Sequence, residues 1–532
     1  MRLNSIKNLK FRRWKELSQL SQRRIKIASA GLTSILTGTL ILTNIDDIIW
    51  LSRAIPRSLR TLTAVGVTAI DYKFNFKEDE DSKHRVHSRS AKRMLKLFEA
   101  NGGVYIKFGQ HLAALQYLIP KEYCTEMSVL HNRAPKSSIG EVRTVFKEET
   151  GYEIEEIFQE FDTEPIGTAS LAQVHTGILK TGEKVAIKVQ HAKLKDLAPI
   201  DIAETEKLSR FIKWEFPGFE LDWLASEMKM NLPKEMDFVN EGLNAERAAE
   251  NFKKDSRVRI PKIHWKYTRQ RVLVMELLVG NKITDIDYLK ANNLNAKRIS
   301  EKFASIFSKM VFIDRFVHCD PHPGNIFIRV KHGNPFLMFF NRLLANDWEI
   351  ILLDHGLYKT LSKSFIRDYS FLWKSILDGN EEEIKKYSLK LGGGDAYRLF
   401  SCILSQKGWE SIQSSNMNRP ETSQDIDFIQ QNVGQYLPEI AHLLAHMSRD
   451  ILLLLKTNDL VRSVDRILTE GSSMNTFIIM ARYIHQSIYA SESENQSFLK
   501  KSSLYVKYLL SRVQLFFMEY FLYFSLLKNK SP

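Results

Sequence analysis

The sequence carries its strongest chemical signal at residues 318–325, which read His318-Cys319-Asp320-Pro321-His322-Pro323-Gly324-Asn325. The spacing H-x-D-x-x-x-x-N is that of a protein-kinase catalytic loop. Phosphoryl transfer needs a carboxylate that orients or deprotonates the acceptor, and a neutral oxygen ligand for the metal. Asp320 and Asn325 offer both groups on one loop. The stretch therefore predicts a kinase-like fold, with Asp320 catalytic and Asn325 at the metal.

Two further motifs flank this loop in the order that a kinase requires. Downstream, Asp354-His355-Gly356 follows the apolar run Ile350–Leu353 and corresponds to a D-F-G type motif, so Asp354 is the expected second metal ligand. Upstream, Val185-Ala186-Ile187-Lys188 reproduces the V-A-I-K strand, whose lysine contacts the nucleotide phosphates. Each motif alone is a weak signal, but their order is hard to produce by accident. Together they predict ATP and Mg²⁺, a cation that prefers hard oxygen ligands.

Histidines and cysteines in this region have simpler interpretations. His318 and His322 could bind a metal, but no further His or Cys at ligand spacing joins them, so hydrogen-bonded loop residues are favoured. The three cysteines show neither C-x-x-C spacing nor a disulfide framework, and Cys319 is expected to be a small buried filler.

Several features depart from ordinary protein kinases. No G-x-G-x-x-G precedes Lys188; residues 165–175 (PIGTASLAQVH), which include Ala169 and Ser170, stand in that place. No A-P-E follows Asp354-His355-Gly356, and His322 lies where protein kinases usually have a lysine. Phosphorylation of proteins is therefore not favoured.

The order of expected elements predicts an α+β, protein-kinase-like bilobal fold. A helical pattern dominates residues 46–150, and the N-lobe is placed at residues 151–280. Its β-type runs are residues 171–179, 184–190 and 271–278, and the first two are joined by a turn at Lys180-Thr181-Gly182-Glu183. Residues 281–532 form the expected C-lobe and C-terminal helices, with strands near residues 326–330 and 348–353.

The first 45 residues indicate targeting and anchoring. Residues 1–26 carry nine Lys or Arg and a single acid, which is typical of a mitochondrial presequence, although a solvated basic tail is the alternative. Residues 27–45 are 19 uncharged residues, and a helix of that length spans about 28 Å. A single transmembrane helix is predicted; a cleaved signal or a buried helix are alternatives. The flanking charges favour a single-pass protein of the mitochondrial inner membrane whose kinase-like domain faces the intermembrane space.

Composition adds constraints on partners. The formal net charge is +14, which suits an anionic partner, and 44% of residues are hydrophobic, as in globular proteins. No recognised nucleic-acid module and no basic stripe interleaved with aromatics is present, so nucleic acid is not an expected partner. The apolar run 513–527 is too short to span a bilayer comfortably; packing on the α lobe is favoured over interfacial membrane contact.

With these motifs in place, the sequence resembles the mitochondrial branch of the UbiB/aarF-domain (ADCK) family of atypical kinases. The resemblance covers roughly residues 90–380. Besides the loop at residues 318–325 and Asp354-His355-Gly356, it rests on motifs that match K-x-G-Q, the family's Ala-rich loop and E-x-D. These are Lys107-Phe108-Gly109-Gln110, Pro165–His175 and Glu235-Met236-Asp237, the last followed by Glu241 and Asn244.

The resemblance implies specific roles. Glu241 would pair with Lys188, and the loop with Ala169 and Ser170 would bind nucleotide. The helix with Lys107 and Gln110 would cover the mouth of the site, with Lys107 facing Glu235 and Asp237. Such a cover favours ATP hydrolysis, or action on a membrane lipid or quinone-like small molecule, in coenzyme Q or lipid homeostasis. The alternative is a nucleotide-binding scaffold that positions or distributes lipid without chemistry.

Overall fold

The structure is a computed structural model that describes residues 45–77, 79–113, 119–131, 136–215, 222–331, 347–414, 447–469 and 476–528. The chain divides into two compact units, Met1–Val67 and Thr68–Pro532. Of the first unit, the described part is the beginning of the long helix α2 (Ile45–Asn75). Everything below concerns the second unit.

The smaller lobe is built on an antiparallel sheet. In its described part the strand order is β1-β3-β4-β6, and β2 pairs with β3. The bounds of these strands are β1 Phe158–Phe161, β2 Gly167–Thr168, β3 Ala172–Leu179, β4 Lys184–Gln190 and β6 Val272–Glu276. Gly182 has φ 84° between β3 and β4, a backbone conformation that glycine adopts without a steric penalty.

The β4 strand uses both of its faces. Val185, Ile187 and Val189 are buried in one core with Phe146 of α6 (Ile139–Thr150). Because side chains alternate along a strand, Lys188 faces the opposite side of the sheet. Helix α6 begins with a capping box between Ser138 and Glu141. Because α6 packs on the opposite face of the sheet, the strand that carries Lys188 is held in place.

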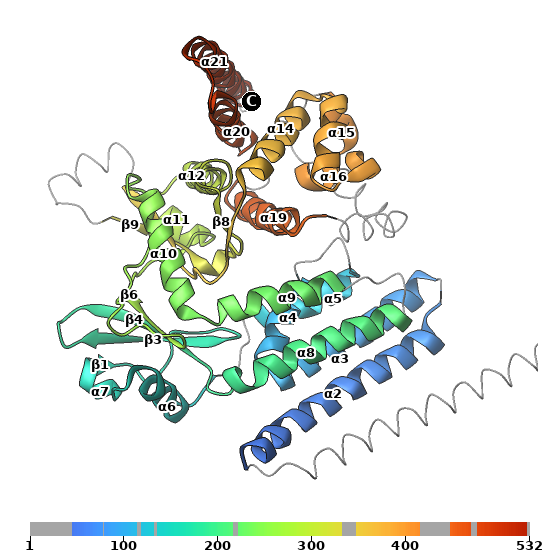
Figure 1. Cartoon of the computed structure of the whole chain (residues 1–532), viewed down its shortest axis with the longest axis vertical. Helices are drawn as coiled ribbons and strands as arrows, with labels where there is room; N and C mark the ends of the chain where they lie inside the picture. Colours follow the sequence, from blue (N-terminus) through green and yellow to red (C-terminus); the bar gives the residue numbers. More distant parts are fainter. Residues whose placement is uncertain are drawn as a thin grey trace, which may run out of the picture. The chain divides into compact units, whose positions relative to one another are not determined.

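Helices occupy the side of the lobe that carries Lys188. They are α3 (Glu80–Asn101), α4 (Val104–Ala113), α5 (Lys121–Ser128), α8 (Leu194–Glu215), α9 (Asp222–Glu235) and α10 (Phe238–Phe252). The first three pack on one another, α4 also contacts α8, and α8 packs on α9 (Figure 1). Asp71, near the end of α2, binds both Arg89 and Arg93 of α3.

The larger lobe is mainly helical, with short strands near the smaller lobe. The bounds of the strands are β5 Val258–Arg259, β7 Asn281–Lys282, β8 Phe316–His318, β9 Ile326–Val330, β10 Trp348–Leu352 and β11 Tyr358–Thr360. Their described pairing is β5-β10-β9-β7 in one sheet and β11-β8 in another. The bounds of the helices are α11 Ile286–Ala291, α12 Ala296–Lys309, α14 Lys363–Asp378, α15 Glu381–Lys390, α16 Tyr397–Ser405, α17 Trp409–Gln413, α19 Arg449–Thr469, α20 Thr476–Ser493 and α21 Phe498–Lys528.

Two cores hold this lobe together. One joins α10 and β6 to α12, β9 and β10, through residues such as Phe238, Leu273, Phe303 and Ile350. The other packs α14, α16, α19 and α20 around the fully buried Trp373. Because the first core crosses from one lobe to the other, the elements that carry Lys188 and Asp320 are held in one packed body.

The predicted kinase-like fold is confirmed in its main features. The expected strands appear as β3, β4, β6, β9 and β10, with ends that differ by at most two residues. The domain boundaries at residues 150 and 280 stay predictions.

The prediction of a single-pass inner-membrane protein is corrected. Across the residues that the structure describes, no helix is both long and apolar enough to cross a membrane. The presequence-like residues 1–26 and nearly all of the predicted span at 27–45 lie outside the described residues. In that run four Thr, two Ser and two Gly dilute the apolar residues, so the lack of charge was a weak basis for a span.

Candidate active site

The loop at residues 318–325 leaves β8 and is folded by its own backbone contacts. Cys319 N donates to Leu357 O at 3.0 Å. The backbone N–H of Asp320 donates to His318 Nδ1 at 3.2 Å, and that of Gly324 donates to His322 Nδ1 at 3.1 Å. Burial lowers the pKa of both imidazoles, which keeps them neutral acceptors. These contacts fit the interpretation of both histidines as residues that shape the loop.

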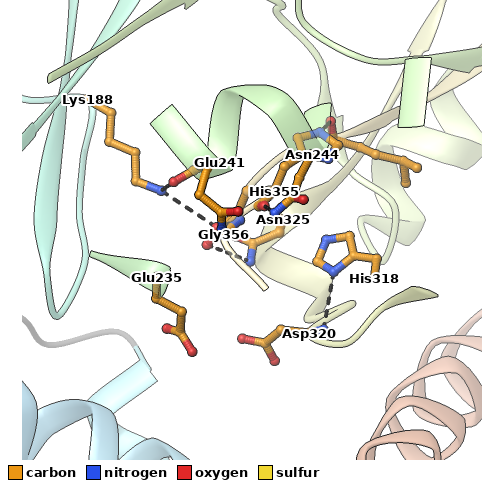
Figure 2. A network of polar contacts seen from close by, with 12 residues as sticks. Lys188, Glu235, Glu241, Asn244, His318, Asp320, Asn325, His355 and Gly356 are labelled. Atoms are coloured by element: carbon orange, nitrogen blue, oxygen red, sulfur yellow. Dashed lines mark hydrogen bonds and ion pairs between the residues drawn. The ribbon is translucent and has the colours of Figure 1, made fainter. Parts of the chain in front are cut away.

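Lys188 joins the sheet to α10 and to the D-H-G motif. Its Nζ lies 2.8 Å from Glu241 Oε1, 2.9 Å from Glu241 Oε2 and 3.6 Å from Asp354 Oδ1. The side chain of Glu241 is 3% exposed, so it points inward from the first turn of α10 (Figure 2). Burial disfavours the charged amine, but Asp354 and Glu241 outweigh it and raise the pKa of Lys188. An ammonium is thus fixed beside two carboxylates.

Asp354 lies at the centre of the described network. Its φ is 58°, a strained value for a residue with a side chain. Asn325 Nδ2 donates to Asp354 Oδ2 at 3.4 Å, and Gly356 N donates to Asp354 Oδ1 at 3.3 Å. Burial raises the pKa of Asp354, but Lys188 and Lys107 prevail and lower it to about 2. The carboxylate is therefore ionised at neutral pH and is available to a cation.

The next residue, His355, anchors this segment. Its Nε2 lies 3.0 Å from Leu352 O and its Nδ1 lies 2.9 Å from the Tyr358 hydroxyl. Asn244 Nδ2 of α10 donates to His355 O at 3.0 Å (Figure 2). Asn244, which follows Glu241 on α10, thus ties that helix to the D-H-G segment.

Lys107 enters the site from α4. Its Nζ lies 2.8 Å from Glu235 Oε2 and 3.8 Å from Asp320 Oδ2. Burial opposes the charge, but Glu235 and Asp320 raise the pKa of Lys107. Gln110 on the same helix does not point to these acids; its Nε2 donates to Leu130 O at 3.1 Å. The helix therefore inserts one ammonium among the carboxylates, and Gln110 holds the helix in place.

Asp237 has a contact that the sequence did not suggest. Its side chain accepts a hydrogen bond from Val239 N at 3.1 Å and so caps α10. An N-cap of this kind typically stabilises a helix by about 1 kcal/mol. Glu235 thus contacts Lys107, whereas Asp237 fixes the start of the helix that carries Glu241.

The loop with Ala169 and Ser170 connects β2 to β3. Ala169 N donates to Ala172 O at 2.8 Å, and Ala169 O lies 3.0 Å from His191 Nε2. The side chain of Ser170 is buried. Val174 of β3 is the register partner of Lys188 in β4. The loop therefore leads directly into the strand that neighbours the lysine.

Sequence reasoning missed Lys456. This residue of α19 places its Nζ 3.0 Å from Asp320 Oδ1. Burial raises the pKa of Asp320, but Lys456 and Lys107 together lower it far below the usual range. The one signal in the sequence was a single lysine directly after the apolar run Ile451–Leu455.

The oxygen ligands that Asn325 and Asp354 offer suit a metal ion that is bound together with nucleotide phosphates. Within the described residues no group of three or more His, Cys, Asp or Glu is placed to hold a metal ion. Asn325 and Asp354 nevertheless lie side by side, and Mg²⁺ is usually held by one or two carboxylates together with substrate phosphates and water. These two residues could hold Mg²⁺ when nucleotide supplies the remaining ligands.

A lysine on a sheet, paired with a helix glutamate and facing an Asp/Asn loop and a D-H-G segment, defines a protein-kinase-like protein. The ABC1 atypical kinase-like domain matches residues 129–388. AarF domain-containing protein kinase 1 of Xenopus laevis is 44% identical over 405 residues, which are 76% of this chain and 76% of the relative. AarF domain-containing kinase 1 of Drosophila melanogaster is 40% identical over 487 residues, 90% of this chain and 92% of the relative. The chain belongs to this AarF domain-containing (ABC1) family of atypical kinases.

Among solved structures, the complex of Rv3197 with erythromycin from Mycobacterium tuberculosis is 16% identical, with a TM-score of 0.42. That alignment covers 74% of this chain and 99% of the other.

Proposed function

We propose that this chain is an atypical, ATP-dependent kinase or ATPase that binds MgATP at Lys188, Asn325 and Asp354. The observation that supports it most is the place of Asp354, which contacts Lys188 on one side and Asn325 on the other. These groups come from three separate stretches of chain. A structural ion pair alone would not need the asparagine or the strained backbone of Asp354.

Each residue then has one task. Lys188, held by Glu241, binds the α/β phosphates, and the loop with Ala169 and Ser170 lies against the nucleotide. Asn325 and Asp354 would hold Mg²⁺, which would offset phosphate charge when it is bound. Asp320 orients the attacking hydroxyl or water. Its depressed pKa keeps it an acceptor of hydrogen bonds throughout the neutral range.

The cover on the site supports a small acceptor. Lys107 occupies the space between Glu235 and Asp320, so a protein hydroxyl could reach Asp320 only if α4 moved. Water meets this restriction, and so does a slender lipid-like or quinone-like molecule. The family resemblance supports the second of these and a role in coenzyme Q or lipid homeostasis.

Binding and turnover of MgATP by the purified full chain test the proposal. Lys188→Met should abolish nucleotide binding. Asp320→Asn should keep binding but reduce turnover by about 100-fold or more, as expected for loss of a group that acts in the transition state. Asp395→Asn, a change at an exposed aspartate, is the matched control. A wild-type chain that ignores MgATP, with or without added lipid vesicles, would refute the proposal.

A second candidate is a nucleotide-binding scaffold that positions lipid without phosphoryl transfer. The contacts of Lys107 and Lys456 with Asp320 favour it, because both compete with an acceptor for that carboxylate. Cellular rescue separates the two candidates. If Asp320→Asn restores function fully while ATP binding persists, the scaffold is correct.

A further inference from the structure

The C-terminal helix α21 has two opposite faces. It lies along α20 (Figure 1). Leu515, which is 8% exposed, packs with Ile478 and Ala481 of α20, and Tyr508 stacks on Tyr489. Leu504 and Ser511 are partly buried on the same side. Glu519 on the same face forms an ion pair with Arg482 of α20. At 100° per residue these positions occupy one narrow sector of the helix. Outside this sector, the described side chains of α21 are exposed.

Opposite this sector runs a stripe of exposed apolar and aromatic side chains, here called the α21 stripe. At 100° per residue these positions fall on one face about 140° wide, which exposed Ser502 interrupts between Leu499 and Tyr505. Single exposed apolar residues are common on proteins, but a stripe of this length marks an interaction surface. Its members are Phe498, Leu499, Tyr505, Val506, Leu509, Leu510, Val513, Phe516, Phe517 and Tyr520, which are 42–82% exposed.

Basic side chains border the stripe on both edges. Lys500 and Lys507 lie along one edge, and Lys501 and Arg512 lie along the other; all four are exposed. The single acid of the helix is Glu519, which is paired with Arg482 on the packed face. Over residues 498–520, the exposed surface of α21 is therefore mainly apolar in the middle and positive at its borders.

A basic cavity lies beside the edge that carries Arg512. Its volume is about 540 Å³, and it lies between α12, α20 and α21. Two acids, Glu301 and Glu519, also line it. The cations are in the majority: Arg257, Arg298, Lys302, Arg482 and Arg512. Even with the Arg482–Glu519 pair and the contact of Lys302 with Asp255, the cavity retains an excess of positive charge.

We propose that α21 docks in the plane of an anionic phospholipid bilayer. The α21 stripe enters the boundary between headgroups and acyl chains, while the basic edges and the cavity contact lipid phosphates. Helices with an apolar face and Lys or Arg at its borders bind membranes in this way. A second copy of the chain is a poorer occupant, because paired helices would bring the same positive edges together. This inference goes beyond the nucleotide site and stands whether or not the chain turns over ATP.

Vesicle flotation of the full chain tests this proposal. Vesicles of phosphatidylcholine with about 30% phosphatidylserine should bind the chain, and pure phosphatidylcholine should bind it far less. Binding should weaken as salt rises. The double change Phe516→Ser and Phe517→Ser should lower the vesicle affinity at least about tenfold, because two large side chains lose their apolar environment. Arg512→Gln should lower it about fivefold.

The matched control is Leu389→Ser, which removes an apolar side chain of α15 that is 66% exposed. It should bind vesicles like the wild type, and circular dichroism should find all variants folded. The proposal fails if neither vesicle binds, if both bind equally, or if the phenylalanine changes leave binding intact. A dimer in sedimentation velocity that these changes dissociate, without vesicle binding, would assign the stripe to a second copy instead.

Discussion

Lys456 Nζ lies 3.0 Å from Asp320 Oδ1, so the loop at residues 318–325 is tied to α19, a helix far along the chain. With Lys107 on its other oxygen, Asp320 has an ammonium group on each side. These two cations determine how strongly Asp320 can accept a proton, and α19 thereby becomes part of the candidate active site.

Replacement of Lys456 by Met should alter the pH dependence of ATP turnover. Lys456 lowers the pKa of Asp320. Its loss raises that pKa, so the carboxylate protonates at higher pH and the acid limb of the kcat/KM profile moves to higher pH. Lys359→Met is the control, because it removes a different ion pair to α19, with Asp450. An unchanged acid limb in Lys456→Met would exclude this role.

Replacement of Lys107 should lower the free energy of unfolding, because its partner Glu235 is buried. Glu235 has a side chain that is 7% exposed, so Lys107→Met leaves a buried carboxylate without its cation. Such losses cost about 3 kcal/mol or more, whereas replacing both partners by apolar groups is often nearly neutral. The double variant Lys107→Met, Glu235→Leu should therefore recover most of the free energy of unfolding lost in the single variant. Urea unfolding measures the free energy of unfolding of the single and the double variant. A double variant that is less stable than the single variant would contradict the pairing of Lys107 with Glu235.

Gly109 should not tolerate a methyl group. A Cβ at this position would clash with Leu130 Cδ1 and lie 2.8 Å from Phe98 Cδ2, and both of these side chains are fully buried. Gly109→Ala should lower the free energy of unfolding by about 1–3 kcal/mol, despite the better helix propensity of alanine. Gly140→Ala in α6 is the matched control, since a Cβ there meets nothing within 4 Å. Equal effects of the two changes on urea unfolding would refute the crowding.

Asp459 in α19 should make stability depend on pH. Burial raises the pKa of Asp459 to about 6 although Arg462 and Gln406 oppose it. A carboxyl group in an unfolded chain has a pKa of about 4, so the folded chain binds more protons between about pH 4 and 6. Stability conferred by this group therefore falls as pH rises through that window.

Asp459→Asn removes this penalty. The variant should be more stable than the wild type at pH 7.5 by an amount on the order of 2 kcal/mol, and the advantage should shrink toward pH 4.5. Thermal unfolding at the two pH values measures it, with Asp395→Asn as the control. A constant difference at both pH values would contradict the raised pKa.

The sequence predicted what is encoded locally. The V-A-I-K strand, the loop at residues 318–325 and the D-H-G segment have fixed spacings, so their order identified Lys188, Asp320, Asn325 and Asp354 as neighbours in space. Contacts between distant helices have no such spacing. The pairing of Lys456 with Asp320 depends on how α19 packs, and the need for Gly109 depends on the two side chains that press against α4.

Asp237 also has a local hydrogen bond that the motif alone did not predict. Asp237 matches an E-x-D motif, and as the residue directly before a helix it also accepts a hydrogen bond from one of the first free N–H groups, that of Val239. Its place facing Lys107 stays a prediction. The predicted span at residues 27–45 lies almost entirely outside the described residues. Lack of charge is necessary for a membrane span but does not suffice for one.

The pairing of β8 with β11 limits how this kinase-like site can be switched. Strand β11 follows Asp354-His355-Gly356 and pairs antiparallel with β8, the strand that leads into Asp320. The paired residues are Tyr358 with His318, Lys359 with Val317 and Thr360 with Phe316. An outward flip of Asp354 would have to open this β-ladder, so the pairing of β11 with β8 opposes such a flip.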